Sequence, residues 1–130
     1  MKIAVAGVGY VGLVTAVTLA DVGHDVICLD VDKGKLKMLK EGISPIYEYG
    51  LEELMLKNRE RLEFTDDVTK YSEAQVIIIG VGTPEKEDGS ADLSAVFSAA
   101  DSIADNCSDG TVVVCLLYTS PSPRDRSLSR

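Results

Sequence analysis

The 130-residue sequence has little of what metal sites and nucleophilic active sites usually require. It contains one histidine, His24, and three cysteines, Cys28, Cys107 and Cys115. The cysteines are too widely spaced for a metal-binding motif or a disulfide framework, and such cysteine usage fits a reducing cytoplasm. No apolar run reaches the about 20 residues of a membrane-spanning helix, and the amino terminus lacks the pattern of a secretory signal peptide. We therefore expect a cytoplasmic protein with no metal centre and no membrane segment.

Charge is distributed unevenly along the chain. The formal net charge is −8, but residues 1–114 carry −10 and residues 115–130 carry +2. The last 16 residues also contain four of the eleven serines and two of the four prolines, and no glycine. An acidic body binds nucleic acid poorly on electrostatic grounds, so we expect no nucleic-acid partner. The length allows one domain at most.

Short apolar runs alternate with segments of helical periodicity over most of the chain. The runs at 2–6, 25–30 and 75–80 predict buried strands, and another strand begins at 111–114. Strands that are apolar on both faces and alternate with helices indicate an α/β fold with a doubly wound parallel sheet of the Rossmann type, truncated after about five strands. Other elements are expected as helices at 13–22, 33–41, 51–57 and 92–106, an edge strand at 61–65 and a helical turn at 66–72. Asp92 is expected to cap the last of these helices. The inner face of that helix is expected to contain Leu93, Val96, Phe97, Ala100, Ile103 and Ala104.

A glycine motif of the form G-x-G-x-x-G lies between the first strand and the first helix. Gly7 would permit a tight turn, Gly9 would let the backbone approach a pyrophosphate, and Gly12 would let the helix pack closely on the strand. The free N–H groups at the helix start, around Tyr10 and Val11, would face the anion along the helix dipole. The strand–glycine–helix context predicts a dinucleotide-binding site.

Asp30 ends the second strand, 18 residues after Gly12. There its carboxylate can accept both hydroxyls of an adenosine ribose and would repel a 2′-phosphate, which favours NAD over NADP. The alternative is an aspartate that merely caps the next helix. Lys35 lies close enough in sequence to reach the same ribose, or it is a solvated helix lysine. Thr83 follows the strand at 75–80 and lies either beside a nicotinamide ribose or in an ordinary turn.

The remaining reactive side chains do not suggest a catalytic site. His24 lies in a turn at the wrong side of the sheet for an acid or base, Cys28 lies within a buried strand, and Cys107 ends an exposed helix without a neighbouring base. No pair of carboxylates has an evident shared purpose. We therefore expect no catalytic residue within this sequence.

Four ordered segments resemble the UDP-glucose/GDP-mannose dehydrogenase family. They are MKIAVAGVGYVGLVT (1–15), SPIYEYGLEEL (44–54), GVGTP (80–84) and DGSADLS (88–94). Tyr49 stands where the family has a proline. The Tyr-Val-Gly-Leu form of the glycine loop and the Tyr47-Glu48 pair resemble the UDP-glucose 6-dehydrogenase branch. The resemblance covers residues 1–114, which we expect to form an incomplete NAD-binding domain.

This resemblance implies a function and an assignment of residues. NAD would be held at its pyrophosphate by the five residues of the glycine loop already named, at the adenosine ribose by Asp30 and Lys35, and on the nicotinamide side by Thr83. The reaction implied is the NAD-dependent oxidation of UDP-glucose to UDP-glucuronate, by a full-length parent expected to be a homodimer or larger oligomer. The family's catalytic cysteine, lysine and aspartate lie beyond residue 130, so this chain alone is expected to be inactive. The alternatives are a stand-alone NAD-binding module and a dehydrogenase of a related sugar, GDP-mannose or UDP-N-acetylmannosamine.

The resemblance ends after Val114. Where the family continues into a Lys-Ser-Thr-Val-Pro turn, this chain reads CLLYTSPSPRD (115–125). That peptide resembles one reading frame of a transposon-end adapter used for sequencing libraries. We therefore expect residues 115–130 to be a non-native, disordered tail; the alternative is a genuine disordered tail rich in serine, proline and arginine.

Overall fold

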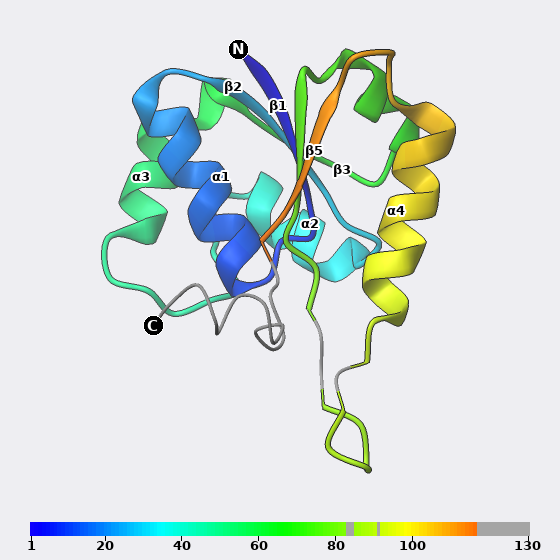
Figure 1. The fold of residues 1–130 in the computed structure, drawn as a ribbon. Coiled ribbons are helices and arrows are strands. Elements are labelled where there is room, and N and C mark those ends of the chain that lie inside the picture. The colour runs from blue at the N-terminus through cyan, green and yellow to red at the C-terminus, as the bar shows by residue number, and fades with distance from the viewer. Residues whose placement is uncertain (83–84, 91, 117–130) are drawn as a thin grey trace, which may run out of the picture.

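A parallel β-sheet forms the centre of the molecule. The structure is a computed structural model that describes residues 1–82, 85–90 and 92–116, and within these residues the sheet has five strands in the order β3-β2-β1-β4-β5 (Figure 1). Every strand pair is parallel, so the crossovers are helical or irregular segments. The elements are β1 (Lys2–Ala6), α1 (Tyr10–Val22), β2 (Asp25–Leu29), α2 (Lys33–Lys40), α3 (Leu51–Lys57), β3 (Leu62–Thr65), β4 (Val76–Ile79), α4 (Ser94–Asn106) and β5 (Val112–Cys115), with short 3₁₀ segments η1 (Arg59–Arg61) and η2 (Val68–Glu73). The doubly wound α/β prediction is confirmed.

The two faces of the sheet are covered by different elements. α1 and α3 pack on one face and α4 and η2 on the other (Figure 1). Val5 and Val26 are buried with Leu13 of α1 on the first face, and Ile27 and Ile77 are buried on the second. Alternate residues of the inner strands therefore enter different apolar clusters, which explains their continuous apolar sequence.

The register aligns the carboxyl ends of the three inner strands. Ala6 of β1 pairs with Leu29 of β2 on one side and with Ile79 of β4 on the other. The residue that follows each strand is consequently brought to one edge of the sheet. This edge contains the point where the strand order reverses, which is where doubly wound proteins bind ligands.

Helix α4 differs from its prediction. The helix begins at Ser94, whose N–H donates to Asp92 Oδ1 at 3.0 Å, but Leu93 occupies the capping position. Of the residues expected to face inward, only Ile103 is fully buried, whereas Phe97 is 64% exposed. Ala100 and Ala104 are exposed as well, so this part of the prediction is wrong. Phe97 is exposed because small or apolar residues lie on two sides of α4, and the described sheet covers only one of these sides.

Strand β5 forms one edge of the sheet and is exposed throughout. Val112, Val113 and Val114 are 56%, 46% and 39% exposed, although a strand of this sequence is typical of a buried position. The strand continues one residue past Val114, because Cys115 pairs with Ile79. No element of the described residues covers either face of this apolar strand, which fits a sheet that is incomplete relative to the longer members of its fold.

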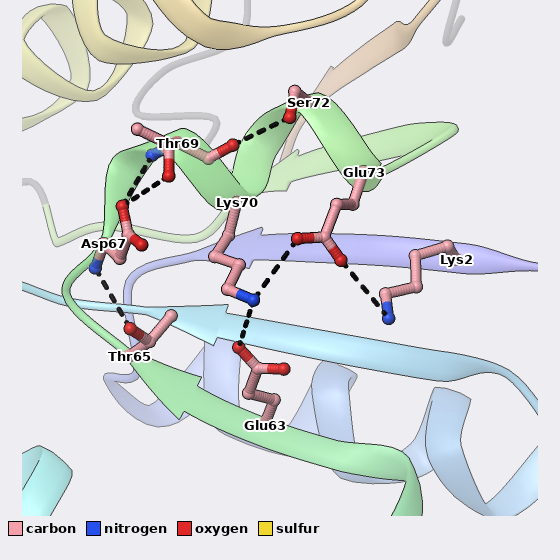
Figure 2. Close-up of polar contacts among 8 residues, drawn as sticks. All are labelled: Lys2, Glu63, Thr65, Asp67, Thr69, Lys70, Ser72 and Glu73. Carbon is pink, nitrogen blue, oxygen red and sulfur yellow. Dashed lines mark hydrogen bonds and ion pairs between the residues drawn. The ribbon is translucent and has the colours of Figure 1, made fainter.

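Ion pairs connect the 3₁₀ segment η2 with the sheet. Lys70 of η2 lies 3.7 Å from Glu63 of β3 and 3.3 Å from Glu73, which in turn lies 3.8 Å from Lys2 of β1 (Figure 2). The contacts with Glu73 and Glu63 raise the pKa of Lys70. These side chains are all partly solvated and each pair contributes little to stability. The buried Tyr71 supplies the apolar contact that anchors the segment.

Candidate functional site

The turn after β1 and the first turn of α1, together called the glycine turn, contain three glycines with three different surroundings. Gly7 has a φ of 100°, and a Cβ there would lie 2.8 Å from the backbone of Val81. A Cβ on Gly12 would lie 2.0 Å from the carbonyl oxygen of Gly7, whereas one on Gly9 would meet nothing within 4 Å. Gly7 and Gly12 are therefore required by the fold itself. Gly9 is not, and its bare backbone borders open space.

Helix α1 begins at this turn without any side-chain cap. Gly9 occupies the capping position, and the first turn contains no acidic residue. The first intrahelical bond is donated by Leu13 N to Gly9 O at 2.9 Å. The N–H groups of Tyr10 and Val11 consequently have no acceptor within the helix, and they coincide with the positive end of the helix dipole. This arrangement suits an anion.

Asp30 follows β2 at the same edge of the sheet and contacts the glycine turn. Its Oδ2 accepts a hydrogen bond from Val8 N at 2.9 Å, and its Oδ1 accepts one from Asp32 N at 2.9 Å. The helix cap is supplied by Asp32, whose Oδ1 accepts from the N–H groups of Gly34 and Lys35. The capping alternative for Asp30 is therefore wrong. Each carboxylate oxygen can accept a further hydrogen bond, because an ionised carboxylate has about four acceptor sites.

A hollow of about 200 Å³ lies beside Asp30, between the sheet edge and α4. Its lining includes Gly7, Asp30, Val31, Tyr71 and Ala99. Burial, with a smaller contribution from the Asp30 carboxylate, raises the pKa of Tyr71 to about 12. The hollow is smaller than the roughly 300–1,000 Å³ of a complete ligand pocket, so it would hold one part of a larger ligand. Sequence reasoning missed Tyr71 because nothing in the pattern of residues 66–72 relates it to Asp30.

The structure gives less information about the other two predicted binding residues, Lys35 and Thr83. Lys35 is half-buried in the first turn of α2, with its N–H bonded to Asp32, and no ion pair in the described structure joins its side chain to Asp30. Thr83 lies outside the described residues, as does the neighbouring Pro84. Strand β4 and Gly80 nevertheless lead toward the same edge, since Gly80 N donates to Ala6 O at 2.7 Å.

The reactive side chains set aside in the sequence are also apart from this edge. Cys28 lies in the middle of β2 and is fully buried, which raises the pKa of its thiol. His24 lies in the turn before β2, at the opposite edge of the sheet, and its N–H donates to Leu19 O. Across the described ranges there is no group of three histidine, cysteine, aspartate or glutamate side chains suited to a metal ion, and no helix long and apolar enough to span a bilayer.

A contact that the sequence did not reveal joins the glycine turn to the loop between α2 and α3. The Tyr10 hydroxyl donates a hydrogen bond of 2.7 Å to Glu48 Oε2, and this bond raises the pKa of Tyr10. Glu48 also begins a type II turn, in which Leu51 N donates to Glu48 O and Gly50 has φ 78° and ψ −5°. The two partners are 38 positions apart and belong to no common periodic pattern.

The sheet topology, the glycine turn and Asp30 together define a dinucleotide-binding domain of the doubly wound class. The model of the UDP-glucose/GDP-mannose dehydrogenase family, NAD binding domain, matches residues 1–122, and the chain belongs to this family. The chain is 52% identical over 118 residues to the UDP-glucose 6-dehydrogenase of Rhizobium meliloti (strain 1021), a match that covers 88% of this chain and 27% of the relative. The chain thus spans about a quarter of the length of such relatives.

Solved structures of related dehydrogenases share the fold. The GDP-mannose dehydrogenase of Pseudomonas aeruginosa is 40% identical with a TM-score of 0.77, over 79% of this chain and 24% of that one. The UDP-D-ManNAc dehydrogenase of Pyrococcus horikoshii is 32% identical with a TM-score of 0.84, over 88% and 28% of the two chains. The similarity therefore extends to relatives named for three different nucleotide sugars.

Proposed function

We propose that this chain is the NAD-binding part of an enzyme that oxidises UDP-glucose to UDP-glucuronate. The observation that carries the proposal is the open backbone at Gly9, which lies between the uncapped start of α1 and the Asp30 carboxylate. A side chain at Gly9 would disturb nothing in the protein, and Gly9 occupies the uncapped start of α1, which together support a ligand that approaches the backbone there.

Each residue of the site has a separate task in this proposal. The N–H groups of Tyr10 and Val11 would donate to the pyrophosphate, and Gly7 and Gly12 would hold the turn in the required shape. Asp30 would accept the two hydroxyls of the adenosine ribose, while Val8 and Asp32 keep its carboxylate oriented.

Two further residues are assigned by the family resemblance. Lys35 would contribute to the adenosine ribose and Thr83 to the nicotinamide side. NAD, when bound, supplies a hydride acceptor. The chain itself binds and orients this group, and the groups that act on the sugar would belong to the rest of the longer protein, which we propose to be a homodimer or larger oligomer.

The names of the relatives support UDP-glucose as the sugar nucleotide of this proposal. The Rhizobium meliloti relative, at 52% identity, is named for UDP-glucose. A second candidate function, the oxidation of GDP-mannose or an N-acetylated UDP-sugar, is favoured by the 40% and 32% identity of solved structures named for those sugars. Activity of the full-length protein with each of the sugar nucleotides distinguishes the two, and UDP-glucose is the expected substrate.

We also propose that the native segment ends at Val114 and that residues 115–130 are a non-native tail. The support is compositional: the tail carries +2 against −10 for the body and resembles an adapter sequence, although the family model runs on to residue 122 and β5 includes Cys115. Sequencing the source DNA tests this boundary. We expect adapter bases directly after the Val114 codon, and a genomic reading frame that encodes all 130 residues would refute the proposal.

Titration calorimetry of the 130-residue chain tests NAD binding. We expect NAD to bind more tightly than NADP, because a 2′-phosphate would meet the Asp30 carboxylate. Gly9→Ala should weaken NAD binding at least about tenfold, since the methyl group occupies the space in front of the backbone. Gly9→Ser should weaken it equally, although serine restores a helix cap and keeps the urea midpoint close to that of the parent chain.

The outcome that contradicts the proposal is equally specific. Parent chain that fails to bind NAD, or a Gly9→Ala variant that binds NAD as the parent does, would refute this site. Asp30→Asn is the matched test of the ribose contact, because it keeps the shape of the side chain and removes its charge. It should bind NAD more weakly and should reduce the preference for NAD over NADP.

A further inference from the structure

The loop between α2 and α3, residues 41–50, passes close to the start of α1 (Figure 1). Its first half is fixed by Ser44, whose N–H donates to Glu52 Oε1 at 3.0 Å and whose hydroxyl bonds Ile46 O at 2.7 Å. Ile46 itself packs against the apolar cluster under α1. The second half is exposed, with Tyr47 fully solvent-accessible. Among the described residues, the Tyr10–Glu48 hydrogen bond is the side-chain bond that joins this half of the loop to α1.

The first two residues of α1, Tyr10 and Val11, are exposed and have no helix cap, whereas the helix is tightly packed from Gly12 onward. The capping residue of α1 is Gly9, which provides no side-chain hydrogen bond, and the turn before it contains a further glycine, Gly7. Glycine-rich backbone loses more conformational freedom on ordering than any other, so an extra anchor here lowers the cost of forming the site. Tyr10 is the first residue of the helix, and its side chain is 55% exposed. Without a partner, that side chain would fix nothing.

We propose that Glu48 is a positioning residue for the dinucleotide: it accepts the Tyr10 hydroxyl and thereby holds the first turn of α1 in the conformation that binds a pyrophosphate. This role deepens the proposed NAD-binding function and rests on it. The Glu48 carboxylate acts through Tyr10 and does not itself contact the ligand.

The sign of the effect separates positioning from simple electrostatics. A carboxylate close to an anion-binding helix terminus repels an anionic ligand, so removal of its charge alone would strengthen binding. Removal of an anchor would weaken binding instead. Glu48→Gln and Glu48→Ala distinguish these effects, because both remove the charge but only glutamine retains an oxygen that accepts the Tyr10 hydroxyl.

NAD titrations of the 130-residue chain, followed by heteronuclear NMR, test the proposal. We expect Glu48→Ala and Tyr10→Phe each to weaken NAD binding about three- to tenfold, the effect of one ordinary, solvent-exposed hydrogen bond. The double variant should be no weaker than either single variant, since both remove the same bond. Glu48→Gln should bind within about twofold of the parent. A second readout is tyrosine fluorescence without ligand, which should change when the Tyr10 hydroxyl loses its partner in Glu48→Ala.

Two control variants match the chemistry of the change. Glu53→Ala removes an acidic side chain from the first turn of the adjacent helix α3, and Tyr47→Phe removes the hydroxyl of a fully exposed tyrosine next to Glu48. Neither should alter NAD affinity.

Three outcomes would overturn the proposal. Unchanged or stronger NAD binding in Glu48→Ala, while the parent chain binds NAD, refutes the positioning role and leaves the NAD site intact. Additive losses in the double variant show that the two residues act independently, which also refutes it. No NAD binding by the parent chain refutes the proposed function and this inference with it.

Discussion

Gly12 lies in the first turn of α1 and packs closely against Gly7, in the turn that precedes the helix. We expect Gly12→Ala to destabilise the domain. The new Cβ would lie 2.0 Å from Gly7 O, whereas ordinary contact begins at 3.4 Å, so the helix must move by more than about 1 Å. Gly80 faces Gly12 from the end of β4, where a Cβ would lie 2.9 Å from the Gly12 Cα. The helix therefore has no free space to move toward on that side, and close-packed interiors yield little.

The size of this effect follows from two opposing terms. Overpacking costs about 3 kcal/mol at the upper end of its usual range, and alanine in a helix gains about 1 kcal/mol over glycine. The net loss is about 2 kcal/mol, or a melting temperature lower by at least about 8 °C for a domain of this size. Urea unfolding followed by circular dichroism measures it.

A second glycine provides the control for Gly12→Ala. Gly34 lies near the start of α2, and a Cβ there would meet only the Oδ1 atom of the capping Asp32, at 3.3 Å, so a shift of a few tenths of an ångström relieves the contact. Gly34→Ala should therefore be neutral or slightly stabilising, because the helix-propensity term acts with little steric opposition. If Gly12→Ala unfolded at the same urea concentration as the parent chain, the close packing of the glycine turn would not be needed for folding.

Three further predictions concern other parts of the molecule. Tyr49→Pro should raise the unfolding free energy by about 0.4–1 kcal/mol, measured by urea unfolding, because position i+1 of a type II turn favours proline; a loss of stability contradicts the turn assignment. Hydrogen bonds from Asn58, and to a smaller extent from Lys57, lower the pKa of Asp21. They therefore stabilise the fold above about pH 3.9, and this stabilisation is lost as the pH falls through the lowered pKa. Asp21→Asn should flatten the dependence of the urea midpoint on pH, and an unchanged dependence would refute this. Cys28 should resist alkylation in the native protein, as mass spectrometry can measure, because burial raises its pKa; labelling as fast as in urea contradicts its burial.

The glycine turn and its neighbours were predictable from sequence because their signals are local. Gly7, Gly9 and Gly12 fall within six positions, and Asp30 ends a strand whose apolar run is unmistakable. Each feature depends on backbone geometry between adjacent elements, which neighbouring residues largely determine. The sequence pattern nevertheless predicts that the first helix begins at residue 13, whereas α1 begins three residues earlier, at Tyr10. The reason is that the capping residue is Gly9, which has no polar side chain to indicate the start of a helix.

Features that depend on distant segments were not predictable. The Tyr10–Glu48 bond joins a helix to a loop without periodicity, and no pattern in either segment indicates the other. Phe97 follows the spacing of a buried helix face, yet it is exposed because the sheet does not extend beneath that side of α4. Which face of a helix is buried depends on what else the chain brings to it.

The position of β1 in the centre of the sheet has a consequence for folding. β1 precedes the other described strands in the chain and is hydrogen-bonded on both sides, by β2 and by β4. Its pairing with β2 closes a short segment, but its pairing with β4 joins Ile3 to Val76, so the whole segment between these two residues must be made first. Loop closure over such a distance slows folding and leaves one edge of β1 open to other chains meanwhile. The first βαβ unit is therefore expected to form early, and the completion of the sheet around its own first strand to be the slow step.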